Sequence, residues 1–121
     1  MPQAALQRWL LALNARGELA AVVEAVSPDC ELSRFGWGEE ADVVKERFVG
    51  PEAVSAWLRR SPAGTVFQAE GPLTADGAGW VQPYLVRVED FQNRGRWILR
   101  LAPDGRIASL EHRPEALPPQ G

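Results

Sequence analysis

The spacing of hydrophobic residues changes once along this chain, near residue 65, and this change constrains the fold more than any other feature. Before it, apolar residues recur every three or four positions, as in Leu6, Trp9, Leu10 and Leu13. After it, strand-forming runs alternate with short turn sequences such as 102–105. Helical periodicity followed by strand periodicity predicts an α+β domain, with N-terminal helices packed on an antiparallel sheet.

Three helices are predicted in the first sixty residues. Two amphipathic helices at about 3–15 and 18–26 are separated by Gly17, and a third begins at Pro51, where proline needs no amide hydrogen bond. The predicted strands are 30–35, 43–49, 65–71, 80–90, 96–101 and 106–113. Short turns between the last four predict a meander. Residues 1–113 are expected to form one domain, and 114–121 a flexible tail.

Composition and charge exclude several classes of protein. The 121 residues carry 13 Lys and Arg against 16 Asp and Glu, and no basic run is present, so neither a nucleic acid nor a membrane surface is an expected partner. Cys30 is the single cysteine and His112 the single histidine, which is a poor set for a metal. No phosphate-binding glycine loop occurs, so no cofactor is expected. No long apolar run suggests a signal peptide or a membrane span, and a cytoplasmic location is expected.

The turn at 102–105 predicts a register for the last hairpin in which Trp97 faces Leu110. One face of the sheet then carries an apolar set, with His112 beyond it: Trp97, Leu99, Leu101, Ala108 and Leu110. The opposite face carries Ile98 and Ile107, which predicts a homodimer through the outer side of the sheet.

The preceding hairpin supplies the candidate catalytic residues. A loop at 92–95 would place Asp90 opposite Trp97 and near His112, whereas a loop shifted by one residue would place Arg87 and Glu89 there. Histidine titrates near neutrality and a carboxylate can orient it, so Asp90 and His112 form a candidate acid–base pair. The alternative is a strand-end histidine that is solvated or hydrogen-bonded.

Three segments resemble the nuclear transport factor 2-like superfamily: 7–15 with 17–19, 48–54, and 101–107. The resemblance covers the chain from about Leu6 to Arg113. It implies a cone-shaped α+β roll, with about three N-terminal helices packed on a curved, mainly antiparallel sheet enclosing a pocket, and a dimer through the outer sheet face. The superfamily includes ketosteroid isomerases, SnoaL-like polyketide cyclases, limonene epoxide hydrolases, dehydratases and non-catalytic domains.

The resemblance does not extend to the steroid-isomerase site. The positions of the family's oxyanion-hole tyrosine, general-base aspartate and protonated aspartate are occupied here by Trp9, Arg34 and Trp97. Because an arginine cannot act as the base, a classical ketosteroid isomerase is not expected. The epoxide-hydrolase pattern matches only in part: its last-strand aspartate falls close to His112, and Arg87-Val88-Glu89 resembles its Arg-x-Asp pair only in the shifted register.

Two functions follow from these residues. The first is a pocket for a small, largely apolar molecule, lined by Trp9, Arg34, Tyr84, Trp97 and Leu110. Arg34 would bind an anionic group, and Asp90 with His112 would support cofactor-free isomerisation, cyclisation, dehydration or hydrolysis. The second is a non-catalytic dimeric domain for ligand binding or interaction, whose pocket is filled by its own aromatic residues. The five tryptophans of the chain are enough to fill such a pocket and make the second hypothesis credible.

Overall fold

A computed structural model of the chain describes residues 2–115. The helices are α1 (Pro2–Asn14), α2 (Leu19–Ala25) and α3 (Pro51–Leu58), with a short 3-10 helix, η1 (Gly38–Glu40). The strands are β1 (Val26–Phe35), β2 (Val44–Val49), β3 (Val66–Ala69), β4 (Thr74–Asp76), β5 (Gly79–Val88), β6 (Phe91–Leu101) and β7 (Ile107–Pro114).

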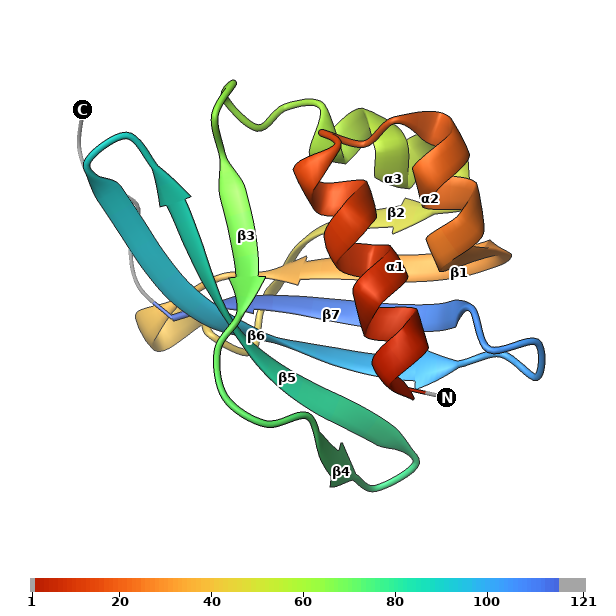
Figure 1. The fold of residues 1–121 in the computed structure, drawn as a ribbon. Helices are drawn as coiled ribbons and strands as arrows, with labels where there is room; N and C mark the ends of the chain where they lie inside the picture. The colour runs from red at the N-terminus through yellow and green to blue at the C-terminus, as the bar shows by residue number, and fades with distance from the viewer. Residues whose placement is uncertain (1, 116–121) are drawn as a thin grey trace.

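The strands form one curved sheet in the order β2-β1-β7-β6-β5-β3, with β4 paired to β5. The β1–β7 pair is parallel, and the other pairs are antiparallel. All three helices lie on the same face of this sheet (Figure 1). The predicted α+β architecture, with three helices on a mainly antiparallel sheet, is therefore confirmed.

Gly17 connects the helices to one another, because only glycine fits its position. Its φ is +75°, and a Cβ there would lie 2.7 Å from both the Ser55 carbonyl oxygen and the Leu58 Cβ on α3. The Ser55 hydroxyl also donates a hydrogen bond to the Gly17 carbonyl. The close approach of α3 to the end of α1 thus depends on the missing side chain.

Strand β1 is longer than the sequence predicts. The second helix was expected to reach Val26 and the strand to begin at Cys30, but α2 ends at Ala25 and β1 begins at once. Pro28 fits within β1 because the pairing with β7 is irregular between Val26 and Glu31, so no ladder hydrogen bond is lost at the proline.

The last hairpin has the predicted faces but a different register. Trp97 pairs with His112 and Leu99 with Leu110, a shift that leaves each side chain on its expected side. Near the turn, a bulge between Arg100 and Leu101 changes the side of the sheet on which the side chains lie. As a result Ile107, which was expected on the outer face, is fully buried in the core.

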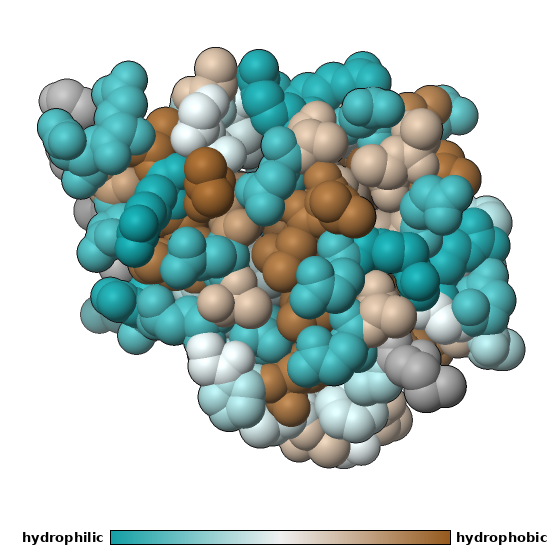
Figure 2. Space-filling model, viewed as in Figure 1, coloured by the Kyte–Doolittle hydropathy of each residue, from teal (hydrophilic) through white to brown (hydrophobic). Residues whose placement is uncertain are grey.

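The helix side of the molecule presents mostly hydrophilic side chains, with hydrophobic ones gathered between α1 and β3 (Figure 2). No helix within residues 2–115 is long and apolar enough to cross a membrane.

Near the C-terminal end of the described residues, β7 includes Pro114, and the Glu115 amide donates a hydrogen bond to the Arg94 carbonyl at 2.8 Å. The rest of the predicted tail lies outside the described residues.

Replacing Gly17 with alanine is expected to destabilise the fold more than the same change at Gly64. Both glycines have positive φ, at +75° and +85°, so alanine costs about 1 kcal/mol of backbone strain at either position. Only at Gly17 does the new Cβ also collide with α3, which adds about 1–3 kcal/mol. Urea unfolding of the two variants measures the difference. Equal losses would show that α3 does not depend on close contact at Gly17.

Candidate binding site

Aromatic side chains fill the space between the helices and the sheet. Trp9 from α1, Tyr84 from β5 and Trp97 from β6 are each at most 1% exposed. The Trp9 ring meets Trp97 edge-on at 6.2 Å, and the Tyr84 ring stacks on Trp97 at 4.6 Å, between centroids. The three rings that were expected to line a pocket are thus packed against one another.

The strand register brings His112 into this cluster. Trp97 and His112 are direct cross-strand partners, and the Tyr84 ring stacks on the His112 ring with centroids 5.2 Å apart. Tyr84 pairs with Gly95, where a Cβ would collide with the Tyr84 hydroxyl and lie 2.6 Å from the Arg113 carbonyl. Gly95 therefore provides the space in which the tyrosine hydroxyl reaches the histidine.

Both nitrogens of His112 are hydrogen-bonded inside the protein. The Trp97 Nε1–H donates to His112 Nδ1 at 3.1 Å, and His112 Nε2 lies 3.2 Å from the Tyr84 hydroxyl oxygen. An indole N–H can only donate, so Nδ1 must accept and the neutral ring carries its hydrogen on Nε2. His112 then donates to Tyr84. Protonating the ring would break the bond to Trp97.

Burial lowers the pKa of His112 to about 3, and the positive charge of Arg34 adds to this effect. Burial also raises the pKa of the Tyr84 hydroxyl. Near neutral pH both side chains are therefore uncharged. The cluster is a neutral hydrogen-bonded network rather than an acid–base pair.

The structure does not bring Asp90 to His112. Strands β5 and β6 pair Val88 with Phe91, so Asp90 lies with Glu89 in a two-residue turn and is exposed. The predicted loop at 92–95 belongs to β6 instead, and the predicted register of this hairpin is wrong. The turn lies roughly 20 Å along β6 from Trp97, at about 3.3 Å per residue. The shifted alternative is also wrong, because Arg87 pairs with Gln92.

Arg34 is held by a carboxylate at the edge of the aromatic cluster. Its Nε donates to Glu46 Oε1 at 2.7 Å, and Glu46 Oε2 accepts from Arg60 Nη1 at 2.7 Å. The hydrogen bond from Arg60, followed by that from Arg34, lowers the pKa of Glu46. The three residues join β1, β2 and the end of α3 with a net positive charge.

A hollow of about 270 Å³ lies beside this cluster, between α3, β3 and the end of β7. We call it the mouth hollow, and its lining residues are Trp57, Leu58, Arg60, Ser61, Phe67 and His112. The Trp57 and His112 rings meet in a T-shaped arrangement, with their centroids 5.1 Å apart. Phe67 is held in place by Asn14, whose side-chain amide exchanges two hydrogen bonds with the Phe67 backbone, at 3.0 and 2.8 Å.

Of the residues expected at the site, His112 lines the mouth hollow, whereas Leu110 is 1% exposed and part of the core. Neither Trp57 nor Phe67 was expected at the site from the sequence. The loop between α3 and β3 gives no sign in the sequence that the Trp57 and Phe67 rings line the same hollow. Within residues 2–115, no group of three His, Cys, Asp or Glu side chains could hold a metal ion.

Comparison with known proteins addresses the fold. No family model matches the sequence, and no curated protein matches it. Among solved structures, a SnoaL-like isomerase candidate from Agrobacterium tumefaciens superposes with a TM-score of 0.74, 16% identity, and coverage of 95% of this chain and 97% of that one. A ketosteroid isomerase candidate from Kribbella flavida gives 0.71 at 21% identity, covering 98% and 82%.

A third similar structure is a SnoaL-like protein of unknown function from Burkholderia thailandensis. It gives a TM-score of 0.71 at 18% identity, with 95% of each chain covered. Similarity over nearly the full length of these chains shows the same arrangement of helices and strands. At such low identity the likeness extends to the fold and leaves the chemistry of the site to the residues described above.

The buried histidine predicts a specific loss of stability in mild acid. Its pKa is about 3 in the folded protein and near 6.5 when unfolded, so the unfolded chain binds the proton first as the pH falls. The contribution of His112 is complete above pH 6.5 and decreases by up to about 1.4 kcal/mol per pH unit toward pH 3.

The variant His112→Asn separates this effect from the titration of carboxylates. Asparagine keeps an oxygen that can accept from Trp97 but does not titrate. Between pH 6.5 and 5 the parent protein should lose about 2 kcal/mol more than the variant in urea unfolding. Parallel curves for the two proteins would show that His112 is not held neutral.

Proposed function

We propose that this chain, which has the nuclear transport factor 2-like fold, binds a small aromatic or apolar molecule in the mouth hollow without converting it. The observation that carries the proposal is the closed interior: Trp9, Tyr84 and Trp97 occupy the centre of the cone and leave the hollow above His112 open. A volume of about 270 Å³ is near the lower end of the range for small-molecule sites.

The groups that line the hollow suit binding better than proton transfer. No carboxylate is among its lining residues, and the nearby Glu46 is bonded to two arginines. His112 has both nitrogens engaged and a pKa far below neutrality. A general base needs a free lone pair and a pKa near the working pH, and His112 has neither.

The lining also indicates the chemistry of the ligand. Trp57 and Phe67 offer aromatic surfaces, and Arg60 uses one N–H for Glu46, which leaves other donors of its guanidinium for a second acceptor. One or two aromatic rings with a carboxylate would match these groups. The carboxylate would lie toward Arg60, and the rings between Trp57 and Phe67.

The binding of 2-naphthoate, followed by quenching of tryptophan fluorescence, tests this proposal. Replacing Trp57 with leucine should weaken binding about tenfold or more, because the ring supplies stacking surface. Trp37 lies outside the mouth hollow, and Trp37→Leu is the matched control that should leave binding unchanged. No saturable quenching in the parent protein, or equal weakening by both changes, would reject the mouth hollow as the site.

Acid–base conversion of a ligand is a second candidate, favoured by the fact that His112 lines the hollow beside Tyr84. Under this alternative a bound substrate would have to displace Tyr84 or Trp97 from the ring nitrogens. It predicts turnover that His112→Asn abolishes while binding persists. Our proposal predicts no turnover in either protein.

We also propose a homodimer through the outer face of the sheet. Ile98 supports it, whereas Ile107 no longer does, because Ile107 is buried in the core. Arg96 pairs with Arg113 across β6 and β7 on that outer face, and the charge of Arg113 is balanced by Glu111 and Asp42. Sedimentation equilibrium tests the dimer, and Ile98→Glu should shift the protein toward monomer.

A further inference from the structure

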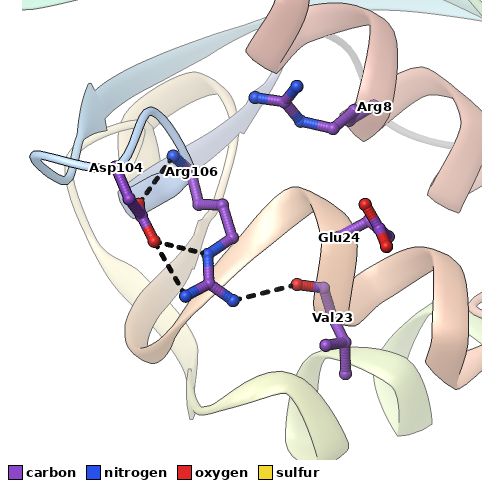
Figure 3. A pocket seen from close by; sticks show the side chains of 5 residues that line it. All are labelled: Arg8, Val23, Glu24, Asp104 and Arg106. Atoms are coloured by element: carbon purple, nitrogen blue, oxygen red, sulfur yellow. Dashed lines mark hydrogen bonds and ion pairs between the residues drawn. The ribbon is translucent and has the colours of Figure 1, made fainter.

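A second hollow lies at the opposite end of the cone from the mouth. It has a volume of about 340 Å³, and its lining residues are Arg8, Val23, Glu24, Asp104 and Arg106. We call it the polar hollow. The two hollows lie near opposite ends of β7, since Arg106 immediately precedes this strand and His112 is near its last residue. The four charged side chains come from α1, α2 and the turn before β7 (Figure 3).

Two of these four charges neutralise each other within the protein. The Arg106 Nε donates a hydrogen bond to Asp104 Oδ2, and the Arg106 Nη2 lies 2.8 Å from the same oxygen. The Arg106 Nη1 donates to the Val23 carbonyl at 3.3 Å. The Asp104 side chain also accepts from the Arg106 amide at 3.0 Å. These contacts hold the Arg106 guanidinium in one orientation, from α2 across to the turn (Figure 3).

The other two charges have no ionic partner among the described residues. Arg8 makes a single long hydrogen bond, from Nη2 to the Gly105 carbonyl at 3.4 Å, and its Nε is buried without an acceptor. Glu24 makes no hydrogen bond or ion pair with residues 2–115. An unpaired guanidinium and an unpaired carboxylate thus line the same hollow.

This combination determines which ligand charge fits. A simple anion would gain from Arg8 but would be repelled by the unpaired Glu24. A simple cation would gain from Glu24 but would be repelled by the unpaired Arg8. A molecule that carries both charges satisfies both unpaired groups, and charge-assisted hydrogen bonds of this kind are the stronger ones in proteins.

We propose that the polar hollow binds a small zwitterion, such as a free amino acid. Its carboxylate lies against the Arg8 guanidinium and its ammonium group against Glu24. The volume equals that of on the order of ten water molecules, at about 30 Å³ each, which is enough for a small amino acid. This site is independent of the function proposed for the mouth hollow.

Titration of the ¹⁵N-labelled chain with L-alanine, acetate and methylammonium tests the proposal. We expect L-alanine to produce saturable shifts of the Arg8 Nε–H signal and of the Glu24 and Gly105 amides. Acetate and methylammonium each satisfy only one of the two charges. Each should therefore bind at least about tenfold more weakly than L-alanine. Equal binding of acetate and L-alanine would replace the zwitterion with a simple anion and overturn the proposal.

Two variants and one control assign the contacts. Arg8→Lys keeps the charge but not the planar fork, and Glu24→Gln keeps the shape but not the charge, and each should weaken L-alanine binding about tenfold. Arg59→Gln, an exposed change at the end of α3 and outside the polar hollow, should have no effect. Since Glu24 is exposed and makes no described contact, Glu24→Gln leaves the fold intact. Unchanged affinity in both variants, or no saturable shift in the parent chain, would refute the site.

Discussion

The hydrogen bond from Trp97 Nε1 to His112 Nδ1 is the contact on which the interior of this protein depends. A buried indole N–H without an acceptor would cost about 1–3 kcal/mol, so the histidine must stay neutral and keep one orientation. That orientation presents Nε2 to Tyr84 and the ring face to stacking, and Gly95 leaves room for the tyrosine. Strands β5, β6 and β7 are thus joined by three side chains as well as by their backbones.

A filled interior moves any recognition of small molecules toward the two ends of the cone. At the mouth, Trp57 and Phe67 provide aromatic surface beside the Arg60–Glu46–Arg34 network. At the other end, charged side chains dominate. The fold shared with these isomerase candidates holds, in this chain, an interior packed with its own aromatic rings.

The faces of the sheet could be predicted from the sequence, whereas the registers could not. Alternation placed Trp97, Leu99, Leu110 and His112 on one side, and a shift of two residues in the last hairpin did not alter this. The predicted register of the β5–β6 hairpin was wrong because residues 92–95 contain a better turn sequence than the residues that form the turn. Gly95 serves instead to admit the Tyr84 hydroxyl, and Glu89 adopts a φ of +53° in the real turn. The role of Gly95 is tertiary, and local turn preferences contain no information about it.

The parallel pairing of β1 with β7 has a consequence for the order in which the molecule can be completed. β1 follows directly from α2, while β7 is the last strand within residues 2–115, so their ladder joins segments that are far apart in the sequence. Until the ribosome has released β7, the inner edge of β1 has no partner and Leu32 lacks Leu110 as its neighbour. The nascent chain must therefore keep an incomplete sheet from associating with other chains until β7 emerges.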